Sequence, residues 1–102
     1  MATKIRTQQG EQFTEIKILI SHPMENGRNR DPMTGQLIPA HFIQELKVEK
    51  NDRTMITAQL GGSMSQNPFF TFRMKDSKSG DRLRVYWIDN LGLSDSAEHV
   101  IE

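Results

Sequence analysis

The sequence contains no cysteine. The chain therefore forms no disulfide, no thiolate metal site and no covalent sulfur adduct on a thiol of its own. Its longest apolar run, ILI, is too short to span a bilayer, and the opening MATKIRTQQGEQ lacks the apolar segment of a secretory signal. Net charge is missing too, because 13 basic residues balance 13 acidic ones, with the two signs mixed along the chain. This balance disfavours binding to nucleic acid or to an anionic membrane.

A sustained helical period is absent as well, and apolar and polar residues alternate instead. Such alternation is typical of antiparallel strands that bury one face. It predicts strands at residues 13–20, 41–50, 54–60, 68–75 and 82–88, with two further strands at 4–7 and 96–102. Turn residues separate them at 51–52, 76–81 and 89–95, and residues 61–68 have room for one short helical turn.

The same alternation assigns the side chains of the core. In the strand at 82–88, Leu83, Val85 and Trp87 share one face. The other inward positions are Thr14, Ile16, Ile18, Ile20, Phe42, Leu46, Val48, Ile56, Ala58, Leu60, Phe70, Phe72 and Met74. About seven strands in 102 residues predict one domain over 1–102 with an all-β fold, an immunoglobulin-like antiparallel β-sandwich. A small β-barrel is the alternative.

A long polar loop follows the strand at 13–20, and His22 and His41 bracket it. If the two histidines converge, Met24 and Met33 between them would complete a His/Met set suited to copper. The spacing matches no known ligand motif, however, and methionine commonly fills gaps in a core. A metal site and ordinary packing both stay open. His99 is interpreted as an ordinary strand histidine.

Catalytic chemistry has little support in the sequence. His22 with Glu25 or Asp31 would supply a base and an orienting carboxylate, but a nucleophile or a metal is also needed. Ser21 is adjacent to His22, and neighbouring side chains in an extended chain point to opposite faces. No nucleophile elbow, phosphate loop or metalloprotease motif occurs. We therefore expect neither enzymatic activity nor a cofactor.

Three apolar side chains are expected to point away from the core. Phe69 precedes the inward Phe70, and Tyr86 and Ile88 alternate with inward positions. Clustered on one sheet, they would mark a protein partner. Scattered, they would be ordinary surface residues. The sequence leaves both interpretations open.

The segment EIKILISHPMENG, residues 15–27, resembles the signature of the SoxZ family of the sulfur-oxidation (Sox) system. Family members carry a strand E-I-K-x-L-I followed by S-H-P-M-E-x-G-x-R, and here Arg28 or Arg30 stands for the final arginine. The further matching segments are Ile38-Pro39, His41-Phe42-Ile43, Asn67-Pro68-Phe69 and Trp87 with DNLG at 89–92. The resemblance runs from about residue 4 to residue 102.

This resemblance implies a non-catalytic immunoglobulin-type sandwich that pairs with a second sandwich, SoxY. In that pair, SoxY holds the sulfur intermediate of thiosulfate oxidation on one cysteine of a swinging, Gly-rich C-terminal tail. The pair would pass it among a loading c-type cytochrome, a sulfate-releasing hydrolase and, in some systems, a sulfane dehydrogenase. The implied location is the periplasm, reached by co-export on the partner's twin-arginine signal. The missing cysteine and the missing signal would then belong to the partner.

The loop is accordingly expected to recognise a partner. Prolines limit its conformational entropy, and Pro23 and Gly27 are expected to shape its backbone. The expected interface residues are His22, Pro23, Met24, Glu25, Arg28, Arg30, Phe69 and Tyr86. The isolated chain is expected to form a homodimer through exposed Phe69, Tyr86 and Ile88. The alternative function is a periplasmic His/Met metal-binding sandwich.

Overall fold

The computed structural model describes residues 2–102, and within that range it contains seven β-strands and no helix. No helix in this range is therefore long and apolar enough to cross a membrane. The strands are β1 (Thr3–Gln9), β2 (Thr14–Ile20), β3 (Ile43–Lys50), β4 (Arg53–Gln59), β5 (Phe69–Met74), β6 (Arg82–Asp89) and β7 (Ser94–Val100). Residues 61–68 form turns and bends without a helix.

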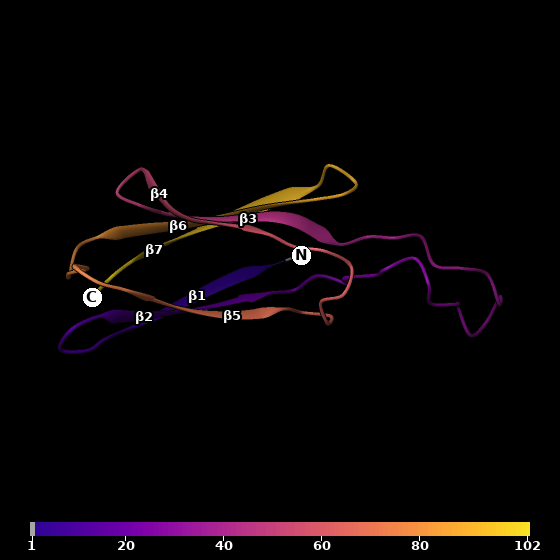
Figure 1. Ribbon diagram of the computed structural model, residues 1–102, viewed down its shortest axis with the longest axis horizontal. Coiled ribbons are helices and arrows are strands. Elements are labelled where there is room, and N and C mark those ends of the chain that lie inside the picture. Colours follow the sequence, from indigo (N-terminus) through magenta and orange to yellow (C-terminus); the bar gives the residue numbers. More distant parts are fainter. Residues whose placement is uncertain (1) are drawn as a thin grey trace.

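Two antiparallel sheets lie one above the other, as Figure 1 shows. One has the strand order β1-β2-β5 and the other the order β4-β3-β6-β7. Because the two sheets are separate and their inner faces share one core, the predicted all-β sandwich of about seven strands is confirmed. The alternative of a closed barrel is wrong.

The alternation along β2, β3 and β6 forms the core much as the sequence predicts. Ile16, Ile18 and Ile20 of β2 are fully buried, in one cluster with the inward side chains of the opposite sheet. Each such burial contributes about 1.5–3 kcal/mol. The buried apolar side chains are Ile16, Ile18, Ile20, Met24, Ile43, Leu46, Val48, Met74, Leu83, Val85, Trp87 and Ile101.

Strand β3 departs from simple alternation at its start. The predicted core includes Phe42 and does not include Ile43, yet Ile43 is fully buried and Phe42 only partly so. The register with β6 shifts between Ile43 and Glu45, so Gln44 is an extra residue in the ladder. A bulge of this kind reverses the parity of the residues before it.

Strand β7 begins earlier than predicted, at Ser94 instead of Ser96, and ends at Val100. The cause is the tight turn after β6, where the N–H of Gly92 (φ 83°) donates to the carbonyl of Asp89 over 3.1 Å. The N–H of Asp89 in turn donates to the carbonyl of Leu93 over 2.8 Å. Pairing between β6 and β7 therefore starts directly after this turn, with Ile88 opposite Ser94.

Polar side chains close one side of the sandwich, where β1 approaches β7. The Thr3 hydroxyl donates to Asp95 over 3.0 Å and accepts a hydrogen bond from the Trp87 indole over 2.9 Å. Further along, the Thr7 hydroxyl and His99 Nε2 are hydrogen-bonded at 2.9 Å. His99 thus lies in a strand and ties the two sheets together.

The segment between β2 and β3 leaves the sandwich altogether. Residues 21–42, here termed the arm, project beyond the ends of the strands and return, as the purple segment of Figure 1 shows. The molecule is accordingly elongated, with extents of 52 × 22 × 18 Å. The arm and its attachment to the sandwich form the candidate functional site.

Candidate functional site

The arm is an ordered, irregular hairpin. At its base, Glu25 and His41 exchange both backbone hydrogen bonds, of 2.7 and 2.8 Å. Further out, the N–H of Ile38 donates to the carbonyl of Asn29 over 2.8 Å. At the tip, the N–H groups of Met33 and Gly35 donate to the side chain and carbonyl of Asp31, each over 2.7 Å. The tip sequence DPMTG combines residues that favour turns, which explains why the hairpin reverses there.

The outer part of the arm exposes large side chains. Met33 is 91% exposed and Leu37 53% exposed, and the side chains of Arg28 and Arg30 are exposed as well. Arg30 also donates from its guanidinium to the carbonyl of Gly35 over 2.9 Å, which holds the tip. Arginine and methionine are enriched at protein interfaces, so this part of the arm has the chemistry of a partner contact.

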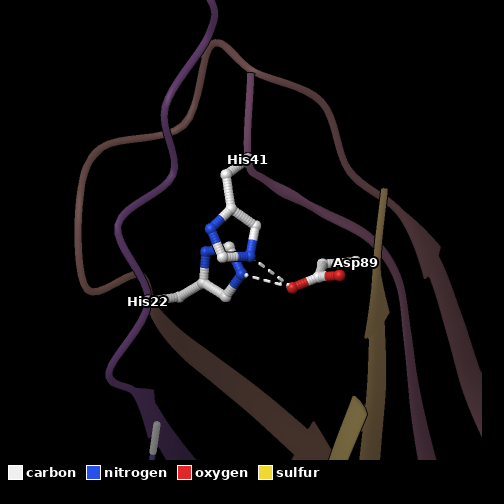
Figure 2. Close-up of side chains that lie close together, drawn as sticks. All are labelled: His22, His41 and Asp89. Atoms are coloured by element: carbon white, nitrogen blue, oxygen red, sulfur yellow. Dashed lines mark hydrogen bonds and ion pairs between the residues drawn. The ribbon is translucent and has the colours of Figure 1, made fainter. Parts of the chain in front are cut away.

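Two histidines and one aspartate fix the base of the arm. His22 follows β2, His41 precedes β3, and Asp89 ends β6 on the same face as Trp87. Figure 2 shows both imidazoles directed at one carboxylate. The Nε2 atoms of His22 and His41 lie 3.1 and 2.7 Å from Asp89 Oδ2. The His22 and Asp89 side chains are fully buried, whereas the His41 side chain is 19% exposed.

The hydrogen bonds determine where the His22 proton lies. The N–H of Met24 donates to His22 Nδ1 over 3.1 Å, so this nitrogen carries a lone pair. The proton of the neutral ring is therefore on Nε2, which donates it to Asp89. Asp89 Oδ1 accepts the N–H groups of Leu91 and Leu93 over 3.0 and 2.9 Å. Both carboxylate oxygens are thus fully used in holding the base of the arm.

Burial and hydrogen bonding shift two pKa values at this base. Burial disfavours the imidazolium and outweighs the hydrogen bond to Asp89, so the pKa of His22 lies below its ordinary value of 6.5. Burial alone would raise the pKa of Asp89, but hydrogen bonds from His22, His41 and the two backbone N–H groups more than offset it. The pKa of Asp89 consequently lies below its ordinary value of 3.8. The base of the arm is a neutral His22 beside an ionised Asp89.

The His/Met metal set, which the sequence leaves open as an alternative, is not assembled. His22 and His41 do converge, and their nitrogens lie with Asp89 inside a 4.8 Å cluster. Met33, however, lies at the exposed tip, and the Met24 sulfur accepts the N–H of Ile43 over 3.4 Å. A metal on Nε2 of His22 would remove the ring proton while Nδ1 still accepts the N–H of Met24. The donor set therefore fits a metal poorly and fits a structural role well. His22, His41 and Asp89, here termed the clasp, hold the base of the arm.

Two asparagines complete the attachment. The N–H of His22 donates to the Asn67 side chain over 3.0 Å, and the N–H of Asn67 returns a 2.9 Å bond to the carbonyl of His22. Asn90 does the same for Phe42, with bonds of 2.8 and 3.0 Å, and also donates to the carbonyl of Ala40 over 2.9 Å. Asn67 thus holds the start of the arm, and Asn90 holds its end.

Segments far apart in the sequence thus meet at one end of the sandwich. They include SHPME, HFI, NPF and DNLG, the segments on which the resemblance to the SoxZ family rests. The family model described as sulphur oxidation protein SoxZ matches residues 3–100. The chain belongs to the SoxZ family. It therefore has a role in the sulfur-oxidation system. A comparison with curated proteins gave no match.

Two of the expected interface residues are buried instead of exposed. His22 and Met24 are only 2% and 5% exposed, so the prediction that their side chains face a partner is wrong. The reason is the clasp: His22 turns inward to Asp89, and Met24, at φ 49°, follows it into the core. The pairing of His22 with Glu25 or Asp31 is also wrong, because Asp89 takes that position.

The remaining loop residues fit their expected positions better. Arg28 and Arg30 are exposed, while Pro23 and Glu25 are half-buried. Glu25 accepts a hydrogen bond from the Asn29 side chain over 2.9 Å. Gly27 has φ 85°, a conformation that favours glycine, so it does shape the backbone. Their contact with a partner remains a prediction.

Phe69, Tyr86 and Ile88 do not form one surface. Phe69 is 57% exposed on the outer face of the β1-β2-β5 sheet. Tyr86 and Ile88 are half-buried on the outer face of the opposite sheet, where the Arg84 guanidinium lies 5.8 Å from the centre of the Tyr86 ring. The interpretation of a shared apolar cluster is therefore wrong, and so is the expectation of one homodimer surface that contains all three residues.

Proposed function

We propose that the chain is a non-catalytic subunit of a sulfur carrier complex and that its arm binds the subunit that carries the sulfur. Membership of the SoxZ family supports a role in sulfur oxidation. The chain has no cysteine, so a covalent sulfur intermediate must be held by another protein. SoxY, with its single cysteine on a Gly-rich tail, is the proposed partner.

The observation that carries this proposal is the construction of the arm. A segment without a hydrophobic core of its own is nevertheless ordered, because it is hydrogen-bonded to the end of the sandwich. His22, His41 and Phe42 of the arm make these bonds, and their partners are Asn67, Asp89 and Asn90. A segment that is ordered before binding loses less conformational entropy when it binds. The base would thus present the exposed side chains at the tip in a fixed geometry.

The proposed complex serves other Sox proteins in turn. SoxY would pass its sulfur group among the loading c-type cytochrome and the sulfate-releasing hydrolase while this chain supports it. The proposed location is the periplasm, with export in the folded pair on the twin-arginine signal of SoxY. The neutral charge of the chain agrees with protein partners and not with nucleic acid or a membrane surface.

Co-expression tests the proposal. The chain is produced with a candidate SoxY that ends in a Gly-rich tail with one cysteine, and the product is sized. After incubation with thiosulfate and the loading cytochrome, both chains are weighed by intact mass spectrometry. We expect a stable heterodimer with the sulfur adduct on the partner alone. A stable adduct on this chain, or two proteins that never associate, would overturn the proposal.

A further inference from the structure

The outer face of the β1-β2-β5 sheet has an unusual charge pattern. Its register places outward side chains in three cross-strand rows, namely Lys4–Leu19–Phe69, Arg6–Lys17–Thr71 and Gln8–Glu15–Arg73. Four of the side chains in these rows are basic, and only one, Glu15, carries a carboxylate. Glu15 already pairs with Lys17 at 3.4 Å. Within residues 2–102, neither Lys4 nor Arg6 forms an ion pair.

This pattern is unfavourable for the free domain. Arg6 lies directly opposite Lys17 in the ladder, and like charges in that position destabilise a sheet. On the outer face of the opposite sheet, by contrast, the cations are balanced. Lys47 pairs with Glu45 at 3.4 Å and Arg84 with Glu49 at 3.5 Å. The folding of the chain gives no reason for the difference between the two faces.

The apolar residues of this face lie beside the cations. Leu19 and Phe69 are neighbours in one row and are 39% and 57% exposed. With Lys4, Arg6 and Lys17 they line an open groove on the sheet surface. An inorganic anion would leave the apolar half of the groove unused. An acidic protein segment that also carries an apolar side chain would match both halves.

We propose that this cationic face (Lys4, Arg6, Lys17, Leu19 and Phe69) docks an acidic segment of a protein partner through its charges and one aliphatic or aromatic side chain. The face lies on the sheet, whereas the arm extends from the end of the sandwich, so this docking is additional to the proposed binding of SoxY. The partner's carboxylates would relieve the repulsion between Arg6 and Lys17, and its apolar side chain would cover Leu19 and Phe69. Binding is accordingly expected to weaken as salt is added.

The test uses the full chain and a synthetic peptide rich in glutamate that contains one phenylalanine and one leucine. Amide shifts in ¹⁵N spectra report where it binds. Two comparison ligands are sodium sulfate and the same peptide with both apolar residues replaced by serine. The test variant is Arg6→Glu, and the matched control is Lys47→Glu, which makes the same change of net charge on the opposite face.

We expect the peptide to shift amides of β1, β2 and β5. Arg6→Glu should weaken binding about ten-fold, as expected when one charge of a cluster is reversed, while Lys47→Glu leaves it unchanged. Arg6→Glu should also leave the melting temperature unchanged or raise it, because it places opposite charges face to face. Equal binding by the serine peptide or by sulfate, equal loss in both variants, or no shifts on this face would overturn the proposal. The peptide contains no SoxY sequence, so its failure would not affect the proposal for the arm.

Discussion

Replacing Asp89 by asparagine keeps the shape of the side chain but removes the charge that holds the base of the arm. The amide oxygen of the variant can still accept the N–H groups of Leu91 and Leu93. The amide nitrogen would then face the Nε2 atoms of both histidines. His41 can change tautomer and accept a hydrogen bond. His22 cannot do so without losing the hydrogen bond from the N–H of Met24.

The magnitude follows from these contacts. One buried donor left without a partner costs about 1–3 kcal/mol, and a hydrogen bond to a charged group is worth about 1.5–3 kcal/mol. Allowing for the new bond to His41, we expect Asp89→Asn to lower the free energy of unfolding by about 2–3 kcal/mol. For a domain of this size, that is a fall in melting temperature of about 10–20 °C.

Thermal unfolding followed by circular dichroism measures the change, with Asp95→Asn as the control. Asp95 is half-buried and accepts one hydrogen bond, from the Thr3 hydroxyl, which an amide oxygen can replace. Hydrogen exchange should also accelerate at the amides of Glu25 and His41, which pair across the base of the arm. A fall for Asp89→Asn no larger than that for Asp95→Asn would refute the clasp.

The remaining predictions concern pH, metal and self-association. The pKa of His22 is lowered from 6.5, so below about pH 6.5 the unfolded chain binds more protons and the free energy of unfolding should fall, with a further loss from Asp89 below about pH 3.8. Denaturant titrations that show the same free energy of unfolding at about pH 7 and at about pH 5 would contradict this, because the unfolded-state pKa of histidine lies between these two values. Calorimetry with Cu(I) or Cu(II) should show only weak binding that His22→Ala leaves unchanged, whereas tight binding abolished by His22→Ala would restore the metal hypothesis. Sedimentation of the isolated chain should show a homodimer that Met33→Ser weakens, because the exposed arm tip has no partner and the neutral chain has little charge repulsion; a monomer at every concentration would be the opposite result.

Much of the fold could be predicted because alternation reports burial directly. Ile16, Ile18 and Ile20 needed only the period of two to be assigned to the core. The burial of Ile43 could not be obtained in this way, since an extra residue at Gln44 reverses the pattern and no local residue type marks it. Whether Phe69 and Tyr86 share a surface was also beyond a parity argument, because parity does not say to which sheet a strand belongs.

The candidate site was only partly predictable for a similar reason. The convergence of His22 and His41 was considered because the two residues bracket one loop. Their shared partner Asp89 falls in a predicted turn, although it continues the inward series Leu83, Val85 and Trp87. The alternation extended by one more step places Asp89 on the inner face. The orientation of His22 depends on that long-range contact and could not be read from its neighbours.

The shape of the arm suggests the most direct test of its function. Glu25 and His41 exchange both backbone hydrogen bonds, which is the geometry that a two-residue turn closes. Replacing residues 26–40 by Asn-Gly should therefore remove the part of the arm beyond its base and leave His22, His41 and Asp89 in place. The lost contacts of Ala40 with Asn90 should cost about 1 kcal/mol.

The decisive measurement is the affinity of SoxY for this shortened chain, beside its melting temperature. We expect a folded domain whose melting temperature falls by only about 4–8 °C and whose binding of SoxY weakens by at least about 100-fold, the effect of losing more than one anchor residue. Arg28→Ala and Met33→Ala alone should each weaken binding without lowering the melting temperature, because both side chains are exposed. A shortened chain that stays folded and binds SoxY as tightly as the full chain would contradict the proposal that the arm recognises the partner.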